Sequence, residues 1–205
     1  MKRASLGFDL RVNPDLQQEN PAQLNQHLAV GMCRNPISAD ASVWLETDEI
    51  ESLTERVLPE FANPLHLWKS IEALIQACER REISTNGLWP VSVTCSESNV
   101  VALAARFGPE FFDNLPTEEE LLSSGWRFVG FDVIDLDGLI SGLKGCGYVE
   151  PTWSLLRNIF GGELNQVGLF NEYSAASHFA EVRGLQIRAH APFVVAGLLT
   201  KGVML

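Results

Sequence analysis

The sequence has few of the patterns from which a chemical activity is usually inferred. Its four cysteines form no Cys-x-x-Cys pair, its four histidines form no His-Glu-x-x-His motif, and no Gly-x-Ser-x-Gly elbow occurs. The glycines around Lys144 do not complete a phosphate-binding Gly-x-x-x-x-Gly-Lys-Ser/Thr loop. We therefore expect free, mostly buried thiols (Cys33, Cys78, Cys95 and Cys146), no cofactor and no enzyme activity.

Long apolar runs are also missing. The longest candidate, residues 191–199, is interrupted by Pro192 and Gly197, so we expect no membrane-spanning segment. Lys2 and Arg3 are followed by no apolar stretch of the kind that secretory signals carry. These two absences predict a cytoplasmic protein that does not bind membranes.

Basic residues are fewer than acidic ones. The chain has 15 Lys and Arg against 26 Asp and Glu, and its net charge is −11. Residues 1–150 carry −12 and residues 151–205 carry +1. Such a charge repels nucleic acid and anionic membranes and attracts a basic protein. Solubility alone is the simpler explanation of the same charge.

The chain does contain enough apolar residues for a core, 46% of its 205 residues. Helices and strands alternate without a strict β-α-β order, which predicts one α+β domain over residues 1–205, with a mixed or antiparallel sheet and several packed helices. No internal repeat is evident. Apolar periodicity predicts strands at 6–12, 43–45, 91–93, 126–134, 185–190 and 193–199. It predicts helices at 21–32, from 48 onward, and at 64–80, 98–107, 137–144, 151–160 and 171–182. Thr117 with Glu120 three residues later forms a capping box, the signature of a helix start.

The segment from Gly125 to Tyr148 is dense in glycine, aromatic residues and aspartate. Its three aspartates, Asp132, Asp135 and Asp137, are candidates for a metal cluster. Asp135 and Asp137 lie two positions apart, so a continuing strand would place both carboxylates on one face, where they could hold Mg²⁺. Capping of a short helix after the strand explains the same residues without a metal. A second chemical alternative is a Cys146 nucleophile with His178 or His190 as its base.

Two acidic groups are the stronger candidates for a functional surface. The first comprises Glu46, Asp48, Glu49, Glu51 and Glu55, and the second comprises Glu118, Glu119 and Glu120. On a helix starting at Asp48, the side chains of Asp48, Glu51 and Glu55 share one face. Such a face either is simply solvated or binds a basic protein.

The run from Trp126 through Asp132 and Asp135 to Cys146, Gly147 and Tyr148 resembles a segment of bacterial immunity proteins, the partners of contact-dependent or other polymorphic toxins. The resemblance covers this run alone and gives no residue a functional role. It implies a cytosolic inhibitor that binds one toxin, commonly a basic nuclease, and blocks its active site.

Our leading hypothesis is therefore an immunity-type protein that neutralises a basic toxin by stoichiometric binding through the two acidic groups. The alternatives are a small hydrolase that uses a metal at Asp135 and Asp137 or the Cys146 thiol, and a structural subunit of a larger assembly.

Overall fold

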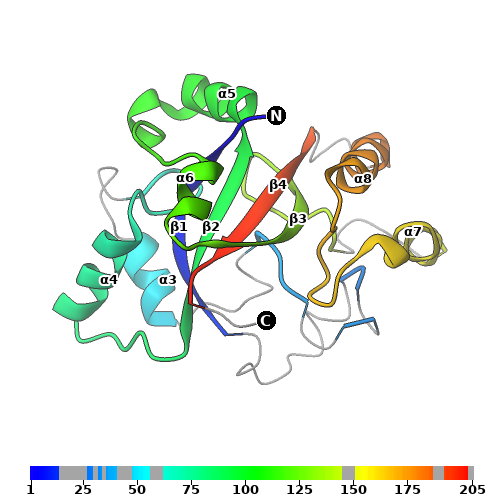
Figure 1. The fold of residues 1–205 in the computed structure, drawn as a ribbon. Coiled ribbons are helices and arrows are strands. Elements are labelled where there is room, and N and C mark those ends of the chain that lie inside the picture. Colours follow the sequence, from blue (N-terminus) through cyan, green and yellow to red (C-terminus); the bar gives the residue numbers. More distant parts are fainter. Residues whose placement is uncertain are drawn as a thin grey trace. The chain divides into compact units, whose positions relative to one another are not determined.

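The computed structural model describes residues 1–13, 27–29, 32–33, 36–40, 48–55, 62–144, 151–186 and 192–202. The fold is of the α+β class, as predicted, with an antiparallel sheet of four strands in the order β1-β2-β4-β3 (Figure 1). Contacts divide the chain into unit 1 (Met1–Asn13, Leu45–Phe128 and Leu198–Leu205) and unit 2 (Pro14–Trp44 and Val129–Gly197). The single domain over residues 1–205 stays a prediction, and each unit is described by itself below.

In unit 1, β1 (Arg3–Val12) pairs antiparallel with β2 (Leu88–Ser96), and the register is shifted between Ser5 and Gly7. The alternating apolar residues of β1 explain the pairing, because one face of the strand carries Phe8 and Leu10 into the core. The helices of this unit are α3 (Asp48–Glu55), α4 (Ile71–Arg80), α5 (Glu97–Phe107) and α6 (Glu118–Ser123), with a short 3₁₀ turn, η2 (Pro109–Phe111). The core cluster joins these strands to α3, α4 and α6 through residues such as Ile50, Trp68, Leu74 and Leu121.

Two helix starts in unit 1 show what the sequence could and could not predict. The capping box is confirmed at α6, where Thr117 and Glu120 satisfy each other's backbone N–H groups. The predicted start of a helix at 64 is wrong, because α4 begins at Ile71 after the Ser70 side chain accepts a hydrogen bond from the Ala73 N–H. The preceding residues form a turn instead.

Unit 2 contains most of β3 (Arg127–Asp135) and β4 (Phe193–Thr200), together with α7 (Thr152–Phe160), η3 (Gly161–Glu163) and α8 (Tyr173–Gln186). Aromatic rings hold its helices together. Phe160 packs edge-on against Phe179 with the ring centroids 5.1 Å apart, and Phe170 packs against Phe179 at 5.5 Å.

Three predicted elements of unit 2 differ from the structure. The helix predicted at 137–144 is absent, because the chain turns after β3 and Gly142 donates back to the Val133 carbonyl at 2.6 Å. The described residues of the helix predicted at 21–32 form turns and a bridge between His27 and Lys144. α8 continues to Gln186, where a strand was predicted, and residues 187–191 lie outside the described part. The strand predicted at 43–45 also lies outside it.

No helix within the described ranges combines the length and the apolar content that crossing a bilayer requires.

Candidate functional site

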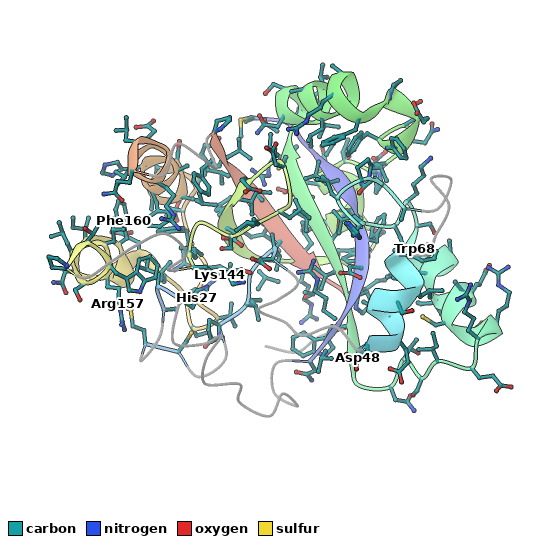
Figure 2. All side chains as sticks on the ribbon, turned by 180° about the vertical axis from the view of Figure 1, so that it is seen from behind. His27, Asp48, Trp68, Lys144, Arg157 and Phe160 are labelled. Atoms are coloured by element: carbon teal, nitrogen blue, oxygen red, sulfur yellow. The ribbon has the colours of Figure 1, made fainter. Side chains whose placement is uncertain are left out.

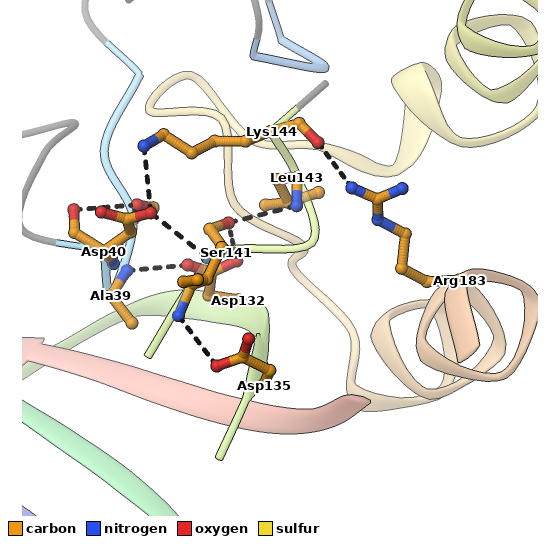
Figure 3. Close-up of polar contacts among 10 residues, drawn as sticks. Ala39, Asp40, Asp132, Asp135, Ser141, Leu143, Lys144 and Arg183 are labelled. Atoms are coloured by element: carbon orange, nitrogen blue, oxygen red, sulfur yellow. Dashed lines mark hydrogen bonds and ion pairs between the residues drawn. The ribbon is translucent and has the colours of Figure 1, made fainter. Parts of the chain in front are cut away.

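A buried carboxylate organises the polar interior of unit 2. Asp132 lies in β3 with no exposed surface, and its oxygens accept three hydrogen bonds (Figure 3). The Ala39 N–H donates to Oδ2 at 2.7 Å, while the Ser141 hydroxyl and the Val133 N–H donate to Oδ1 at 2.8 and 2.7 Å. A buried acceptor of this kind is stable only where such donors surround it. Asp132 therefore fastens two chain segments to β3.

Burial decides the protonation of this carboxyl group. Removal from water disfavours the charged form and raises the pKa of Asp132 to about 7. The three hydrogen-bond donors act in the opposite direction, and the negative charge of Asp40 raises the pKa further. Asp132 thus titrates near neutrality.

An ion pair lies beside Asp132. Lys144 Nζ is 3.0 Å from Asp40 Oδ2, and both side chains are largely buried, with 16% and 13% of their surface exposed. The Ser141 N–H also donates to Asp40, at 3.4 Å. Partial burial makes this pair stronger than one on the open surface and leaves each charge dependent on the other. We call Ala39, Asp40, Asp132, Ser141 and Lys144 the Asp132 cluster.

His27 lies next to the Asp132 cluster and is fully buried beside Lys144 (Figure 2). Its Nδ1 accepts a hydrogen bond from the Ala29 N–H at 3.0 Å, which places the ring proton on Nε2. Nε2 has no hydrogen-bond partner within the described part of the chain. Burial, reinforced by the positive charge of Lys144, lowers the pKa of His27 to about 3. His27 is therefore neutral at physiological pH.

Arg183 of α8 completes the surroundings. Its Nη2 donates to the Lys144 carbonyl at 2.8 Å, and its guanidinium lies 5.5 Å from the ring centre of Phe193. The side chain is almost fully buried, so both contacts are made away from water.

These contacts favour a scaffold role for the Asp132 cluster. Ser141 and Asp132 are 1% and 0% exposed, so a substrate could not reach them in this conformation. The cluster binds residues 36–40 and 141–144 to β3 through hydrogen bonds to Asp132 and the ion pair between Asp40 and Lys144. A functional surface is therefore expected among the exposed residues.

The first acidic group is exposed where the structure describes it. Asp48 and Glu49 occupy the first turn of α3 and face solvent, and Figure 2 marks Asp48 there. Negative side chains at this end of a helix are favoured by its dipole. Glu51 and Glu55 belong to the same helix, but their side chains lie outside the described part, as does all of Glu46.

The second acidic group is mostly engaged within the protein. Glu118 forms an ion pair with Arg3 at 2.8 Å and accepts the hydroxyl hydrogen bond of Thr94. Glu120 caps its own helix by accepting the Thr117 N–H and hydroxyl, and these hydrogen bonds lower its pKa. Glu119 and Glu120 are both exposed, but of the three only Glu119 has no hydrogen bond or ion pair in the described structure.

A surface hollow of about 390 Å³ lies beside this second group. Glu97, Glu118 and Glu119 line it together with Lys2 and Arg3. Because three carboxylates and two basic side chains meet there, the hollow offers little excess of negative charge to a basic partner. The first acidic group is therefore the better candidate surface.

The metal alternative loses its geometric basis. β3 ends at Asp135, so the strand alternation that would align Asp135 with Asp137 stops there. Asp135 is buried and accepts the N–H groups of Gly138 and Ile140 at 3.0 and 3.2 Å, whereas Asp137 is exposed. Among the described residues, no group of three or more His, Cys, Asp or Glu side chains could hold a metal ion.

The thiol alternative falls outside the described structure, because Cys146 and His190 are not among the described residues. His178 is exposed on α8, with its ring 5.3 Å from that of Phe160. The remaining cysteines are free, as predicted, and burial raises the pKa of Cys95 to about 12 and of Cys33 to about 11. Thiols with such pKa values are poor nucleophiles.

Sequence reasoning did not assign the Asp132 cluster, because two of the three donors to Asp132 are backbone N–H groups and carry no residue signature. It singled out Asp132 and Lys144 for other chemistry and gave no weight to Ser141 or His27. Comparison with known proteins adds no functional clue: no family model, no curated protein and no solved structure matches this chain.

Proposed function

We propose that the protein is a cytosolic immunity-type inhibitor that binds a basic toxin, such as a nuclease, and neutralises it stoichiometrically. The acidic side chains would occupy the cleft in which the toxin binds a phosphate-rich substrate, and no bond would be made or broken. The membrane and nucleic acids are not expected partners, because the net charge is −11.

The observation that carries this proposal is the exposed acidic start of α3. Asp48 and Glu49 face solvent in the first turn of a helix that has no basic residue in its last turn. By contrast, Glu118 and Glu120 are tied to Arg3 and Thr117. Exposed carboxylates that no described residue pairs with attract a basic surface and accelerate its capture.

Reversing the charges of α3 should therefore slow association with the toxin. We expect an on-rate about tenfold lower or more at low salt for the variant Asp48→Lys, Glu49→Lys, Glu51→Lys, Glu55→Lys, and a shallower dependence on salt. The probe is the toxin domain encoded by a neighbouring reading frame or recovered by pull-down from the native cell. Association is measured by surface plasmon resonance over a range of salt concentrations.

A matched control has the same change in net charge on exposed carboxylates elsewhere, namely Glu79→Lys, Glu82→Lys, Glu110→Lys and Asp113→Lys. Circular dichroism must show that both variants stay folded. Equal on-rates for the wild type and the α3 variant, or an equal loss in both variants, would contradict a role for the first acidic group.

A further inference from the structure

A six-residue turn in unit 1 is built around one asparagine. Asn63 Oδ1 accepts the N–H groups of Leu65 and Leu67 at 2.9 and 3.2 Å, and the Asn63 N–H donates to the Leu67 carbonyl at 2.8 Å. The Asn63 Nδ2 then reaches β1 and donates to the Leu6 carbonyl at 2.6 Å. One side chain thus closes the turn and attaches it to the strand.

A turn in unit 2 repeats every one of these hydrogen bonds. Asn165 Oδ1 accepts the N–H groups of Val167 and Leu169 at 3.1 and 3.0 Å, and the Asn165 N–H donates to the Leu169 carbonyl at 2.7 Å. Its Nδ2 donates to the Val129 carbonyl of β3 at 2.9 Å. The two turns share the asparagine at the first position and the leucine at the fifth.

Each turn also pairs its last residue with a phenylalanine of its strand. Phe8 and Trp68 exchange two backbone hydrogen bonds of 2.8 Å, and Phe131 and Phe170 exchange two of 2.8 and 2.9 Å. These pairs fall at the same positions of the two turns. The hydrogen-bond pattern is therefore the same from the asparagine to the end of each turn.

The residue before each phenylalanine is a glycine that the turn requires. Gly7 has φ 139° and Gly130 has φ 155°. A Cβ on Gly7 would lie 2.6 Å from Leu67 Cβ, and one on Gly130 would lie 2.7 Å from Leu169 Cβ. Both positions lack space for a side chain, for the same reason.

The correspondence continues into the helix and the strand that follow. Asn63 and Asn165 are 102 positions apart, and the same offset relates the left-handed residues His66 and Gly168. It also matches the buried positions of the two helices, 74, 77 and 78 in α4 with 176, 179 and 180 in α8. It finally aligns Pro90 at β2 with Pro192 before β4.

The strands carry a shared Gly-Phe-Asp, residues 7–9 and 130–132. Each aspartate accepts the N–H of the next residue, Leu10 at 2.8 Å and Val133 at 2.7 Å. The second oxygen differs: Asp9 pairs with Arg11 of its own strand at 2.9 Å, whereas Asp132 binds Ala39. The strand motif is repeated, and the contacts of the second aspartate oxygen differ between the two strands.

We infer that units 1 and 2 are built around two copies of one module, a strand, an asparagine-anchored turn, a helix and a strand, in which Asn63 and Asn165 have the same structural role. A local coincidence would account for one shared turn. It would not account for a strand motif, a turn and a helix face that recur in the same order. The inference is independent of the proposed toxin binding.

Matched substitutions test the equivalence. Asn63→Ala and Asn165→Ala each remove two acceptor contacts and one donor contact, buried at Asn63 and partly buried at Asn165, and we expect each to lower the melting temperature by about 3–8 °C. Asn63→Asp and Asn165→Asp keep the oxygen that accepts two N–H groups, so each should recover part of that loss. Asn158→Ala, at an exposed position of α7, is the control and should leave the melting temperature nearly unchanged.

A second measurement covers the case in which a variant fails to fold. In the wild type, hydrogen exchange should show comparable protection for the amides of Leu65 and Leu67 and for those of Val167 and Leu169. The inference is overturned if one alanine variant is strongly destabilised while the other is neutral, if aspartate rescues only one site, or if only one pair of amides is protected.

Discussion

The variant Asp132→Ala should lose about 3 kcal/mol of unfolding free energy or more at pH 5, because three buried donors lose their acceptor at once. Two of these donors are backbone N–H groups, and the alanine side chain offers them no acceptor. The loss is measured by urea unfolding at fixed salt concentration.

The deficit should shrink as pH rises. The pKa of Asp132 in the folded protein, about 7, lies above its ordinary value of 3.8. The folded state therefore keeps a proton that the unfolded state has released, and the wild type loses stability between about pH 4 and pH 7. Alanine cannot titrate, so the deficit of the variant should be roughly 3 kcal/mol smaller at pH 8 than at pH 5.

The control is Glu181→Ala, an exposed position of α8 in the same unit, where we expect a change below about 0.5 kcal/mol. If Asp132→Ala unfolds at the wild-type urea concentration at pH 5, the three hydrogen bonds do not hold the segments as described. If the deficit does not depend on pH, the carboxyl group does not titrate near neutrality.

The variant His27→Asn should show the opposite pH dependence. The pKa of His27 in the folded protein, about 3, lies below its ordinary value of 6.5. Below pH 6.5 His27 binds a proton in the unfolded state but stays neutral in the folded state, so the wild type loses stability as pH falls. Asparagine removes this effect and keeps an oxygen to accept the Ala29 N–H. Any deficit of the variant at pH 8 should therefore be roughly 2 kcal/mol smaller at pH 5.

The two buried groups oppose each other in the wild type. Between about pH 4 and pH 6.5 the fold gains a proton at Asp132 and loses one at His27, so their contributions to the pH dependence nearly cancel. Urea unfolding from pH 5 to pH 8 should show slopes of opposite sign when Asp132→Ala and His27→Asn are each compared with the wild type. Parallel slopes would mean that the two groups do not titrate as their burial requires.

Local sequence patterns predicted several elements of the fold. Alternation of Leu6, Phe8 and Leu10 predicted β1, and Thr117 with Glu120 predicted the start of α6. The helix predicted from 64 failed because Asn63 followed by Pro64 is a strong helix start in general, whereas here the asparagine binds its own turn and β1. The hydrogen bond from Asn63 to β1 can be recognised only when the position of β1 in space is known.

The site was less accessible to sequence reasoning, for a related reason. The partners of Asp132 include the backbone N–H of Ala39, 93 positions away in sequence, and the Ser141 hydroxyl, which a turn brings back from nine positions further along the chain. The repeated module was missed because few of its aligned residues are identical, chiefly the Gly-Phe-Asp of each strand and the asparagine and leucine of each turn. Apart from the contacts of the two asparagine side chains, what is repeated is a set of backbone hydrogen bonds, and many sequences can make those.

The asparagine-anchored turns have a consequence for how any partner can be recognised. β1 and β3 are the outer strands of the sheet, and the backbone groups of Phe8 and Phe131 on their outward edges are already bonded to Trp68 and Phe170. A foreign peptide could not extend the sheet at these points without displacing the turns, and the same obstruction discourages aggregation by strand addition. Recognition at these two points would therefore depend on side chains, whose identity can change by mutation while the backbone stays as it is.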